Sequence, residues 1–271
     1  MTLIPTLRLS LEMTNVLTRI EMNGLKINLD TLHEIEKEYN EELSYLETKL
    51  QTMAKEAMGD TPVNLSSPDD RSVLLYSRKV RDKSMWGLTF NLGHEMRGNT
   101  MKPKLRTRMR ANVFIRNVRN MTDVVYKTVG QMCAGCLGHG RVRLVNKNGQ
   151  PSKVLNICKP CKGKGIRYMD TNEVAGFKIV PRNPKDTASA GFKTDKVTLE
   201  DRSLELSGDA REFCTSYSRY NAIRTYLSTF VEGMKNNVDD DGFVHPEFMQ
   251  CVTATGRLSS RNPNFQNMPR G

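Results

Sequence analysis

The spacing of apolar residues predicts long helices near both ends of the chain. Residues 8–22 carry apolar side chains at helical intervals, which predicts a helix that ends before Gly24. Over residues 29–57, apolar residues recur in steps of three and four, and Gly59 and Pro62 follow. This pattern predicts one long amphipathic helix, whose apolar stripe we assign to a core or a helix–helix contact and not to chemistry.

Polar residues before the long helix supply two candidate start signals. Asn28 is the favoured N-cap, because its side chain can accept a hydrogen bond from a free backbone N–H of the first turn. Thr31 with Glu34 is the alternative, as a capping box. Either choice starts the helix within a few residues of Leu29.

A third helix is predicted after the turn signals near residue 62. Ser66 or Ser67 can cap it, Pro68 fits its first turn, and it is expected to run to about Lys83. Residues 84–110 then show poor periodicity and many arginines, which predicts a loop or an extended arm.

The rest of the chain alternates between irregular and helical patterns. Residues 111–129 are compatible with a short helix or a strand, and residues 176–193 have the small polar composition of a linker. A short helix is expected to start near residue 195, and residues 208–236 carry a second long helical stripe. Residues 237–247 predict a turn that leads into strands, so the expected fold is mainly α with a few C-terminal strands and a small β-hairpin.

The charge is concentrated in one block of the sequence. The 271 residues contain 41 Lys and Arg against 30 Asp and Glu, for a net charge of +11. Residues 97–167 hold 17 basic residues and the single acid Asp123, which is +16, so the remainder carries 24 basic and 29 acidic residues, or −5. A block of one sign favours a polyanionic partner such as nucleic acid over a merely solvated surface.

Two matched cysteine pairs lie within this basic block. "CAGCLGHG" and "CKPCKGKG" both spell C-x-x-C-x-G-x-G, and Asn148-Gly149 between them is a hairpin signal that would bring the pairs together. Four thiolates with this spacing predict a structural Zn²⁺ site over residues 131–167 with no position left for substrate. The predicted ligands are Cys133, Cys136, Cys158 and Cys161.

The cysteines and acids also allow other interpretations. A redox C-x-x-C is the alternative to zinc, and His139 could replace one ligand. The paired motif resembles the cysteine-rich region of DnaJ-type chaperones over about forty residues, without a J-domain signature. Cys214 and Cys251 are expected to be buried or unremarkable thiols, and residues 239–241 are expected to form a solvated turn and not a metal cluster.

The C-terminal stretch carries the most specific resemblance. "TATGRLSSRNPNFQNMP", residues 253–269, closely resembles the T-x-T-G-R-L-S-S-x-x-P-N-L-Q-N-I-P signature of family A DNA polymerases, where the thumb enters the palm. "NLSSPDDRSVLL" resembles the Asn-x-x-Ser-Pro thumb element of that family. The likeness extends over residues 8–83 and 192–271, in the family's order.

This resemblance implies roles for particular side chains. Arg257 would reach the minor groove of a primer–template duplex, where acceptors occur at similar positions on every base pair. Other polar residues would contact the groove and the phosphates. The implied contacts are Arg257, Ser259, Ser260, Asn264, Gln266 and Asn267 from the signature, and Asn64, Ser66, Ser67, Lys193 and Thr194 from the thumb.

The resemblance also implies an organisation for the chain. We expect thumb helices at 1–83 and 186–236, a basic insertion at 84–185 that holds the zinc module, and the start of the palm at 237–271. In that family the metal-binding aspartates follow the signature, so we expect no catalytic residue here. The chain is then expected to be the N-terminal part of a split, phage-type DNA polymerase, with Mg²⁺ held by a second polypeptide that supplies the fingers and catalytic palm.

Partners and location follow from the same interpretation. The expected partners are primer–template DNA, the complementing polymerase polypeptide and, for the insertion, either DNA or a processivity or exonuclease protein. No apolar run or signal peptide is present in the sequence, so we expect a cytoplasmic protein of a bacterial host acting in DNA replication. The competing hypothesis is a non-catalytic zinc-ribbon DNA-binding or regulatory protein that kept a polymerase thumb.

Overall fold

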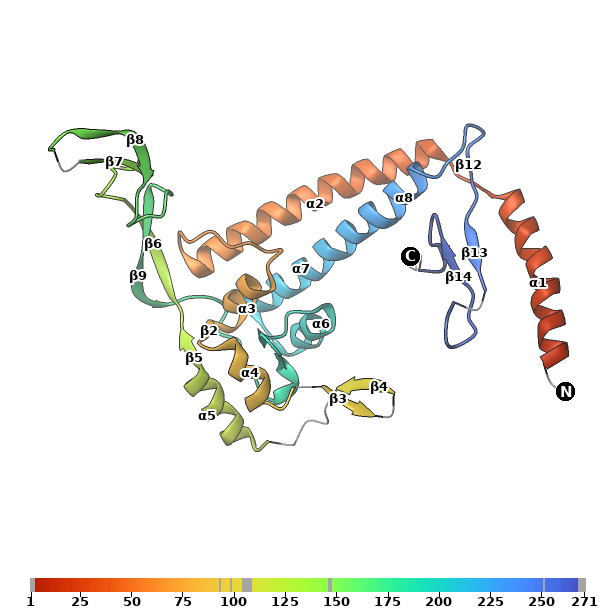
Figure 1. The fold of residues 1–271 in the computed structure, drawn as a ribbon, viewed down its shortest axis with the longest axis horizontal. Helices are drawn as coiled ribbons and strands as arrows, with labels where there is room; N and C mark the ends of the chain where they lie inside the picture. The colour runs from red at the N-terminus through yellow and green to blue at the C-terminus, as the bar shows by residue number, and fades with distance from the viewer. Residues whose placement is uncertain are drawn as a thin grey trace. The chain divides into compact units, whose positions relative to one another are not determined.

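The computed structural model describes residues 3–92, 94–97, 99–103, 109–145, 148–250 and 252–267. The chain divides into two compact units, Met1–Glu47 with Tyr217–Gly271, and Thr48–Ser216. The described residues form eight α-helices and seven two-stranded antiparallel sheets (Figure 1). No helix in these ranges is both long enough and apolar enough to cross a membrane.

The first unit combines helices with short strand pairs. β1 pairs with β12, and β13 pairs with β14. Its elements are α1 (Leu3–Asn23), β1 (Leu25–Lys26), the first part of α2 (Leu29–Met58), the end of α7 (Gly208–Tyr226), a π-helical turn (Leu227–Val231), α8 (Glu232–Lys235), β12 (Phe243–Val244), β13 (Glu247–Met249), β14 (Ser259–Arg261) and a 3-10 turn (Phe265–Asn267).

The start of α2 confirms one of the two predicted caps. The backbone N–H of Thr31 donates to Oδ1 of Asn28 at 3.2 Å, so Asn28 caps the helix. In this unit α2 runs antiparallel to the helix formed by α7 and α8. Two ion pairs, Arg219 with Glu42 and Lys235 with Glu36, link them at 2.7 and 2.9 Å.

The apolar core of the first unit forms where these helices meet the C-terminal segment. Leu32, Val231 and Met234 are buried together, and Phe265 packs against them. The C-terminal part of the helix predicted at residues 208–236 therefore contributes to this core. The π-helical turn interrupts that helix and was not foreseen.

The second unit contains the rest of the chain. Its ribbon of β6 and β9 leads to the cysteine module, from which the β7–β8 hairpin extends. Its elements are the second part of α2, α3 (Pro68–Tyr76), β2 (Arg78–Val80), α4 (Lys83–Thr89), β3 (His94–Arg97), β4 (Thr100–Pro103), α5 (Ala111–Met121), β5 (Thr122–Val124), β6 (Tyr126–Met132), β7 (Arg141–Val145), β8 (Pro151–Ile157), β9 (Ile166–Val174), a 3-10 turn (Pro184–Asp186), β10 (Thr187–Ala188), β11 (Gly191–Phe192), α6 (Lys196–Glu205) and the start of α7.

Helix α3 is shorter than predicted. Ser67 caps it, with its Oγ accepting from the N–H of Asp70 at 3.3 Å, but the helix ends at Tyr76 and not near Lys83. Ser77 adopts a left-handed conformation with φ of 58°, and its carbonyl accepts from Val125 at 3.1 Å. Helix α3 ends here because the residues that follow, Arg78–Val80, form strand β2 and pair with β5, which is distant in sequence.

The expectation of a loop or arm over residues 84–110 was wrong for most of the part described. Asp82 caps helix α4, and β3 pairs with β4 as a hairpin. Trp86 is fully buried, donates its indole N–H to the carbonyl of Gly191 at 3.0 Å and meets Phe90 and Phe192 edge-on. Burial of these aromatic rings fixes a segment that has no amphipathic period of its own.

The linker predicted at residues 176–193 is confirmed only in part, because residues 176–183 form no helix or strand but residues 184–192 contain a 3-10 turn and the strand pair β10–β11. Asp186 is buried and accepts hydrogen bonds from two backbone N–H groups and from the guanidinium of Arg202, the last at 2.5 Å. Phe192 stacks on Tyr76 with ring centroids 4.5 Å apart. A buried ion pair and aromatic packing therefore hold a stretch whose composition is typical of a linker.

Residues 111–129, for which the sequence allowed either a short helix or a strand, contain both. Helix α5 ends at Met121, and strands β5 and β6 follow. Phe114 and Val118 are the buried residues of α5. The helix predicted near residue 195 is confirmed as α6, which Asp195 caps by accepting from the N–H of Thr198 at 2.9 Å.

Candidate metal centre and nucleic-acid interface

The four cysteine sulfurs form one cluster at the end of the β6–β9 ribbon. All four Sγ atoms lie within 4.8 Å of one another, and all four residues are buried. The Sγ atoms of Cys133 and Cys158 are 3.8 Å apart, and those of Cys136 and Cys161 are 3.6 Å apart. Tetrahedral zinc–thiolate bonds of about 2.3 Å would place sulfurs about 3.8 Å apart, so the cluster fits such an ion.

The two C-x-x-C-x-G-x-G turns complete each other through backbone hydrogen bonds. The N–H of Cys133 donates to the carbonyl of Gly165 at 2.8 Å, and that of Cys158 donates to Gly140 at 2.9 Å. In return the N–H of Gly140 points at Sγ of Cys136, at 3.2 Å, and that of Gly165 at Sγ of Cys161, at 3.3 Å. The predicted orientation of N–H groups toward the sulfurs is therefore present in both turns.

Both turns need glycine at the same place. Gly140 and Gly165 have φ of 71° and 75°, and an added Cβ would lie 2.2 Å from the carbonyl oxygen of Gly163 or Gly138, respectively. No side chain fits at that distance. The sequence repeat thus reflects two backbones that pass each other closely, which only glycine permits.

The cluster shifts the pKa values of its thiols in both directions. Burial raises the pKa values of Cys136 and Cys158, whereas at Cys161 hydrogen bonds from the N–H of Gly165 and from the neighbouring thiols outweigh burial and lower the pKa to about 7. A metal ion bound by thiolates would displace these protons, and its charge would offset the burial. Within the described ranges, no other group of three or more His, Cys, Asp or Glu side chains lies close enough to hold a metal.

The remaining candidates for metal chemistry have other roles. His139 is outside the cluster and donates its backbone N–H to the carbonyl of Cys136 at 2.9 Å. Cys214 is fully buried, which raises its pKa to about 11, as expected for an inert thiol. Cys251 lies outside the described residues.

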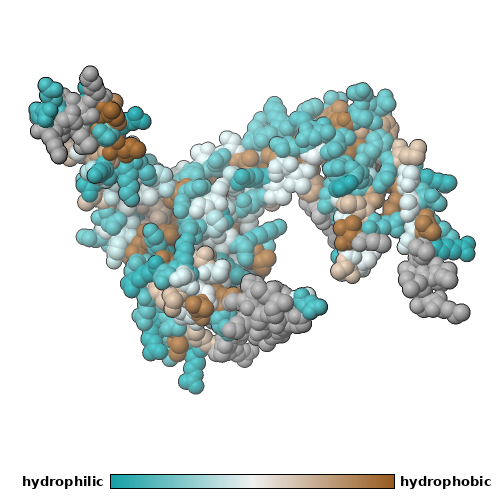
Figure 2. All heavy atoms as spheres, viewed as in Figure 1, coloured by the Kyte–Doolittle hydropathy of each residue, from teal (hydrophilic) through white to brown (hydrophobic). Residues whose placement is uncertain are grey.

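Apolar side chains are exposed around the cysteine module. Met132, Leu137 and Ile157 are each about two-thirds exposed, at 68%, 67% and 64%. Brown patches on the ribbon that carries the cysteines interrupt a largely hydrophilic surface in Figure 2. Lys159 and Arg167 are also exposed, so this surface offers both charge and apolar area.

The polymerase-like signature folds onto the β13–β14 strand pair. Glu247 lies opposite Arg261, and Met249 lies opposite Ser259. Glu247 accepts hydrogen bonds from the side chains of Asn262, at 2.9 Å, and Arg261, at 2.6 Å, which together lower its pKa. This network orders the signature and was not foreseen, because nothing local in the sequence links residue 247 to residues 261 and 262.

Three predicted DNA-contacting residues form a turn within the signature. Ser260 is buried, and its Oγ donates to Oδ1 of Asn264 at 3.1 Å. The backbone N–H of Gln266 donates to the same Oδ1 at 3.1 Å, while the Gln266 side chain is exposed. Ser260 and Asn264 therefore shape the backbone that presents Gln266.

Arg257 lies in the loop before β14. Its side chain is exposed, and its carbonyl accepts from Oγ1 of Thr253 at 2.7 Å, which closes a short turn with Gly256. Ser259 is half-buried on β14. The side chain of Asn267 lies outside the described part of the chain.

The predicted thumb contacts lie at two places in the second unit. Asn64 caps the turn before α3, with Oδ1 accepting from Ser66 at 3.0 Å, and both side chains are exposed. Lys193 is half-buried, and its carbonyl accepts from the hydroxyl of Tyr76 at 3.2 Å. Thr194 is only 7% exposed, so little of its side chain faces solvent.

The acidic turn after α8 is structural, as predicted. Oδ1 of Asp239 accepts from the N–H groups of Asp241 and Phe243 at 3.0 and 2.7 Å. His245, which the sequence did not mark, bonds through Nδ1 to the carbonyl of Glu21 at 2.6 Å and through Nε2 to Asp239 at 3.1 Å. These two acceptors raise the pKa of His245.

Comparison with known proteins places the C-terminal third. Residues 174–271 match the sequence model of DNA polymerase family A. The chain is 57% identical over 90 residues to DNA polymerase I of Treponema pallidum (strain Nichols), covering 33% of this chain and 8% of that protein. It is 29% identical over 163 residues to DNA polymerase I of Deinococcus radiodurans, covering 54% and 16%, and 34% identical over 79 residues to a DNA polymerase of Bacillus phage SP01, covering 28% and 8%.

A solved structure gives a weaker likeness. The POL domain of Pol1 from M. smegmatis, in complex with DNA primer-template and dNTP, aligns with 96% of this chain and 27% of its own. The TM-score is 0.46 and the sequence identity is 16%, which does not establish a shared fold.

The sequence matches agree on one class of protein and one family. Residues 174–271 are similar to a segment of DNA polymerases, and the relatives above are themselves DNA polymerases. The family whose model matches is DNA polymerase family A, which supports the resemblance seen in the signature. The chain spans less than a fifth of the length of these relatives.

Proposed function

We propose that this chain is the DNA-binding thumb and first palm part of a family A DNA-directed DNA polymerase that acts in DNA replication. The match of residues 174–271 to that family carries the proposal. The signature supports it, because Arg257 and Gln266 present exposed polar side chains on an ordered scaffold. Such side chains can contact any duplex without reading its sequence.

In this proposal the phosphoryl-transfer step uses carboxylates outside the described residues. Two-metal catalysis needs carboxylates that hold both ions, and the described ranges bring together only the cysteine cluster. A complementing polypeptide with the remaining palm and the fingers would hold Mg²⁺ in a split enzyme. The chain's own residues would bind and orient the primer–template.

The cysteine cluster is proposed to hold a structural Zn²⁺ ion. Cys133, Cys136, Cys158 and Cys161 would be its ligands, and all four tetrahedral positions would be filled by protein. The ion would fix the end of the basic ribbon. The module would therefore add phosphate contacts, since it lies in the block of residues 97–167 with a charge of +16.

DNA binding by the 271-residue protein tests the first part. We expect anisotropy of a labelled primer–template to report binding that weakens steeply with salt, because phosphate contacts release counterions. Arg257→Ala should weaken binding about tenfold with little change in the salt slope, as expected for a groove contact. Arg19→Ala, at an exposed arginine of α1, is the matched control and should change little.

Primer extension and metal content test the other parts. The chain should extend a primer with Mg²⁺ only when mixed with a complementing polymerase polypeptide, and incorporation by the pure chain would contradict the proposal. Cys133→Ser and Cys158→Ser should each release zinc and weaken DNA binding. If the chain binds DNA but no complementing polypeptide restores primer extension, the non-catalytic regulatory protein would be favoured instead.

A further inference from the structure

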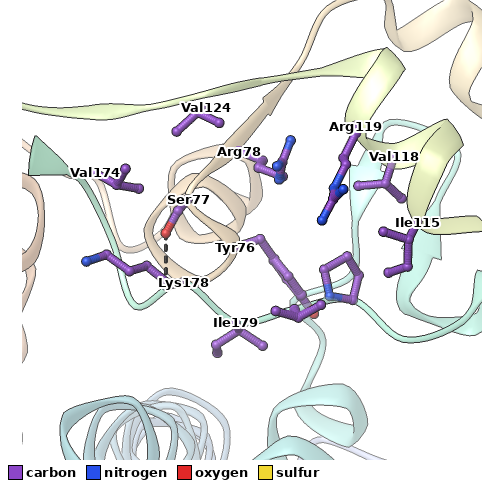
Figure 3. Close-up of a pocket in the computed structure, with 12 residues that line it drawn as sticks. Tyr76, Ser77, Arg78, Ile115, Val118, Arg119, Val124, Val174, Lys178 and Ile179 are labelled. Carbon is purple, nitrogen blue, oxygen red and sulfur yellow. Dashed lines mark hydrogen bonds between the residues drawn. The ribbon is translucent and has the colours of Figure 1, made fainter. Parts of the chain in front are cut away.

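A pocket of about 300 Å³ lies in the second unit, and its lining includes neither the four cysteines nor any residue of the polymerase signature (Figure 3). It is lined by residues of α3, β2, α5, β5 and β9, by Ser77 and by residues 178–181. Because all of these belong to Thr48–Ser216, the pocket is formed within one compact unit. None of its residues is among the signature and thumb residues proposed to contact DNA, so this inference goes beyond that function.

The walls of the pocket are aliphatic. Ile115 from α5, Val124 from β5 and Val180 line it, and Val180 is 62% exposed. Tyr76 also lines it but is only 3% exposed, because its ring stacks on Phe192. The pocket therefore offers apolar contact without an open aromatic face.

Two guanidinium groups enter the same pocket. Figure 3 shows Arg78 from β2 and Arg119 from α5 reaching into one space, while the Lys178 side chain extends away from them. Arg78 donates from Nη1 to Oγ1 of Thr122 at 3.0 Å. Neither arginine forms an ion pair with a described residue. The nearby acid of β5, Asp123, instead forms an ion pair with Arg81 at 2.7 Å.

We propose that this pocket binds a short peptide segment of an acidic partner protein, in which carboxylates lie beside a bulky aliphatic side chain. Arginine recognises carboxylates through paired N–H donors, and the aliphatic walls would take the neighbouring side chain. A nucleotide fits less well, because a base needs an aromatic face on which to stack. Arg119 and Val180 are the residues on which recognition depends most, as both are exposed at the opening.

The test uses the 271-residue protein and a fluorescein-labelled, amidated peptide, GEEIVG. We expect anisotropy to show a dissociation constant on the order of 100 µM, as for a small site with few contacts. The peptides GQQIVG and GEESSG, which remove the charge or the aliphatic side chains, should each bind at least about fivefold more weakly.

Variants locate the binding at the pocket. Arg119→Glu and Val180→Asp should each weaken GEEIVG at least about fivefold. Arg116→Glu is the matched control, because Arg116 is an exposed arginine of the same helix that does not line the pocket, and it should change binding less than about twofold. Thermal melting should show that all three variants remain folded, since all three side chains are exposed.

Three results would overturn the proposal. GEEIVG and GQQIVG could bind equally well or not at all at millimolar concentration. The charge reversals at Arg119 and Arg116 could have equal effects, which would indicate a general basic surface. Primer–template DNA could displace the peptide while Arg119→Glu weakens DNA binding as much as peptide binding, which would make the pocket a nucleic-acid contact.

Discussion

Replacing Gly140 by alanine should destabilise the cysteine module by more than the cost of the left-handed backbone conformation at this residue. A left-handed residue other than glycine costs about 1–2 kcal/mol. Gly149 has a similar φ of 74° but open space where a Cβ would lie, so Gly149→Ala measures this cost by itself. At Gly140 the added Cβ would lie 2.2 Å from the carbonyl oxygen of Gly163, so the two turns must separate by about 1 Å to restore contact.

That separation adds an overpacking cost of about 1–3 kcal/mol to the free energy of folding. It also lengthens the hydrogen bond that the backbone N–H of Cys158 donates to the carbonyl of Gly140. We therefore expect Gly140→Ala to be about 2 kcal/mol less stable than Gly149→Ala. The assay loads the two variants and the parent protein with Zn²⁺ and follows both its release to a chromogenic chelator and thermal unfolding. Equal release rates for the two variants would refute the reasoning, because the close approach of the two turns would then make no difference to the stability of the module.

Three further predictions rest on single contacts. Asp186→Ala should destabilise the second unit by about 3 kcal/mol in chemical denaturation, because it leaves the buried Arg202 with only the half-exposed Glu205 as an ionic partner and removes the acceptor of two backbone N–H groups; a loss below about 1 kcal/mol would contradict this. Trp86→Ala should cost about 3–5 kcal/mol in the same assay, and Leu204→Ala, at an 80% exposed side chain, should cost little. His245 has a raised pKa, so its stabilising effect is complete below about pH 6.5 and is lost as pH rises through the folded value. The fall in melting temperature caused by His245→Gln should therefore be larger near pH 6 than near pH 8.5, and a pH-independent difference would contradict the assignment.

The long helices and the cysteine module could be predicted because their signals are local. The stripe of residues 29–57 and the cap at Asn28 place α2 almost to the residue. The repeated C-x-x-C-x-G-x-G motif identified four sulfurs that the fold brings together. In both cases neighbouring residues along the chain supply the periodicity or the ligands.

The segments that were predicted wrongly depend on distant partners. Residues 84–92 are ordered because Trp86 packs on Phe192, and β2 forms because β5 lies beside it. Residues 182–187 are ordered by the charge of Arg202, which lies on α6. No local pattern reveals such contacts, since each one joins elements far apart in the sequence. The same holds for Glu247, whose partners Arg261 and Asn262 lie across a strand pair.

The hydrogen bonds that each cysteine turn donates to the other have a consequence for biosynthesis. The N–H of Cys133 donates to the carbonyl of Gly165, so the first turn of a nascent chain lacks this hydrogen bond until the second turn is made. Synthesis at about 5–20 residues per second leaves its thiols unshielded for roughly 2 to 6 seconds. During that interval the early cysteines are exposed to oxidants and to competing ions, and once the second turn emerges both halves close together.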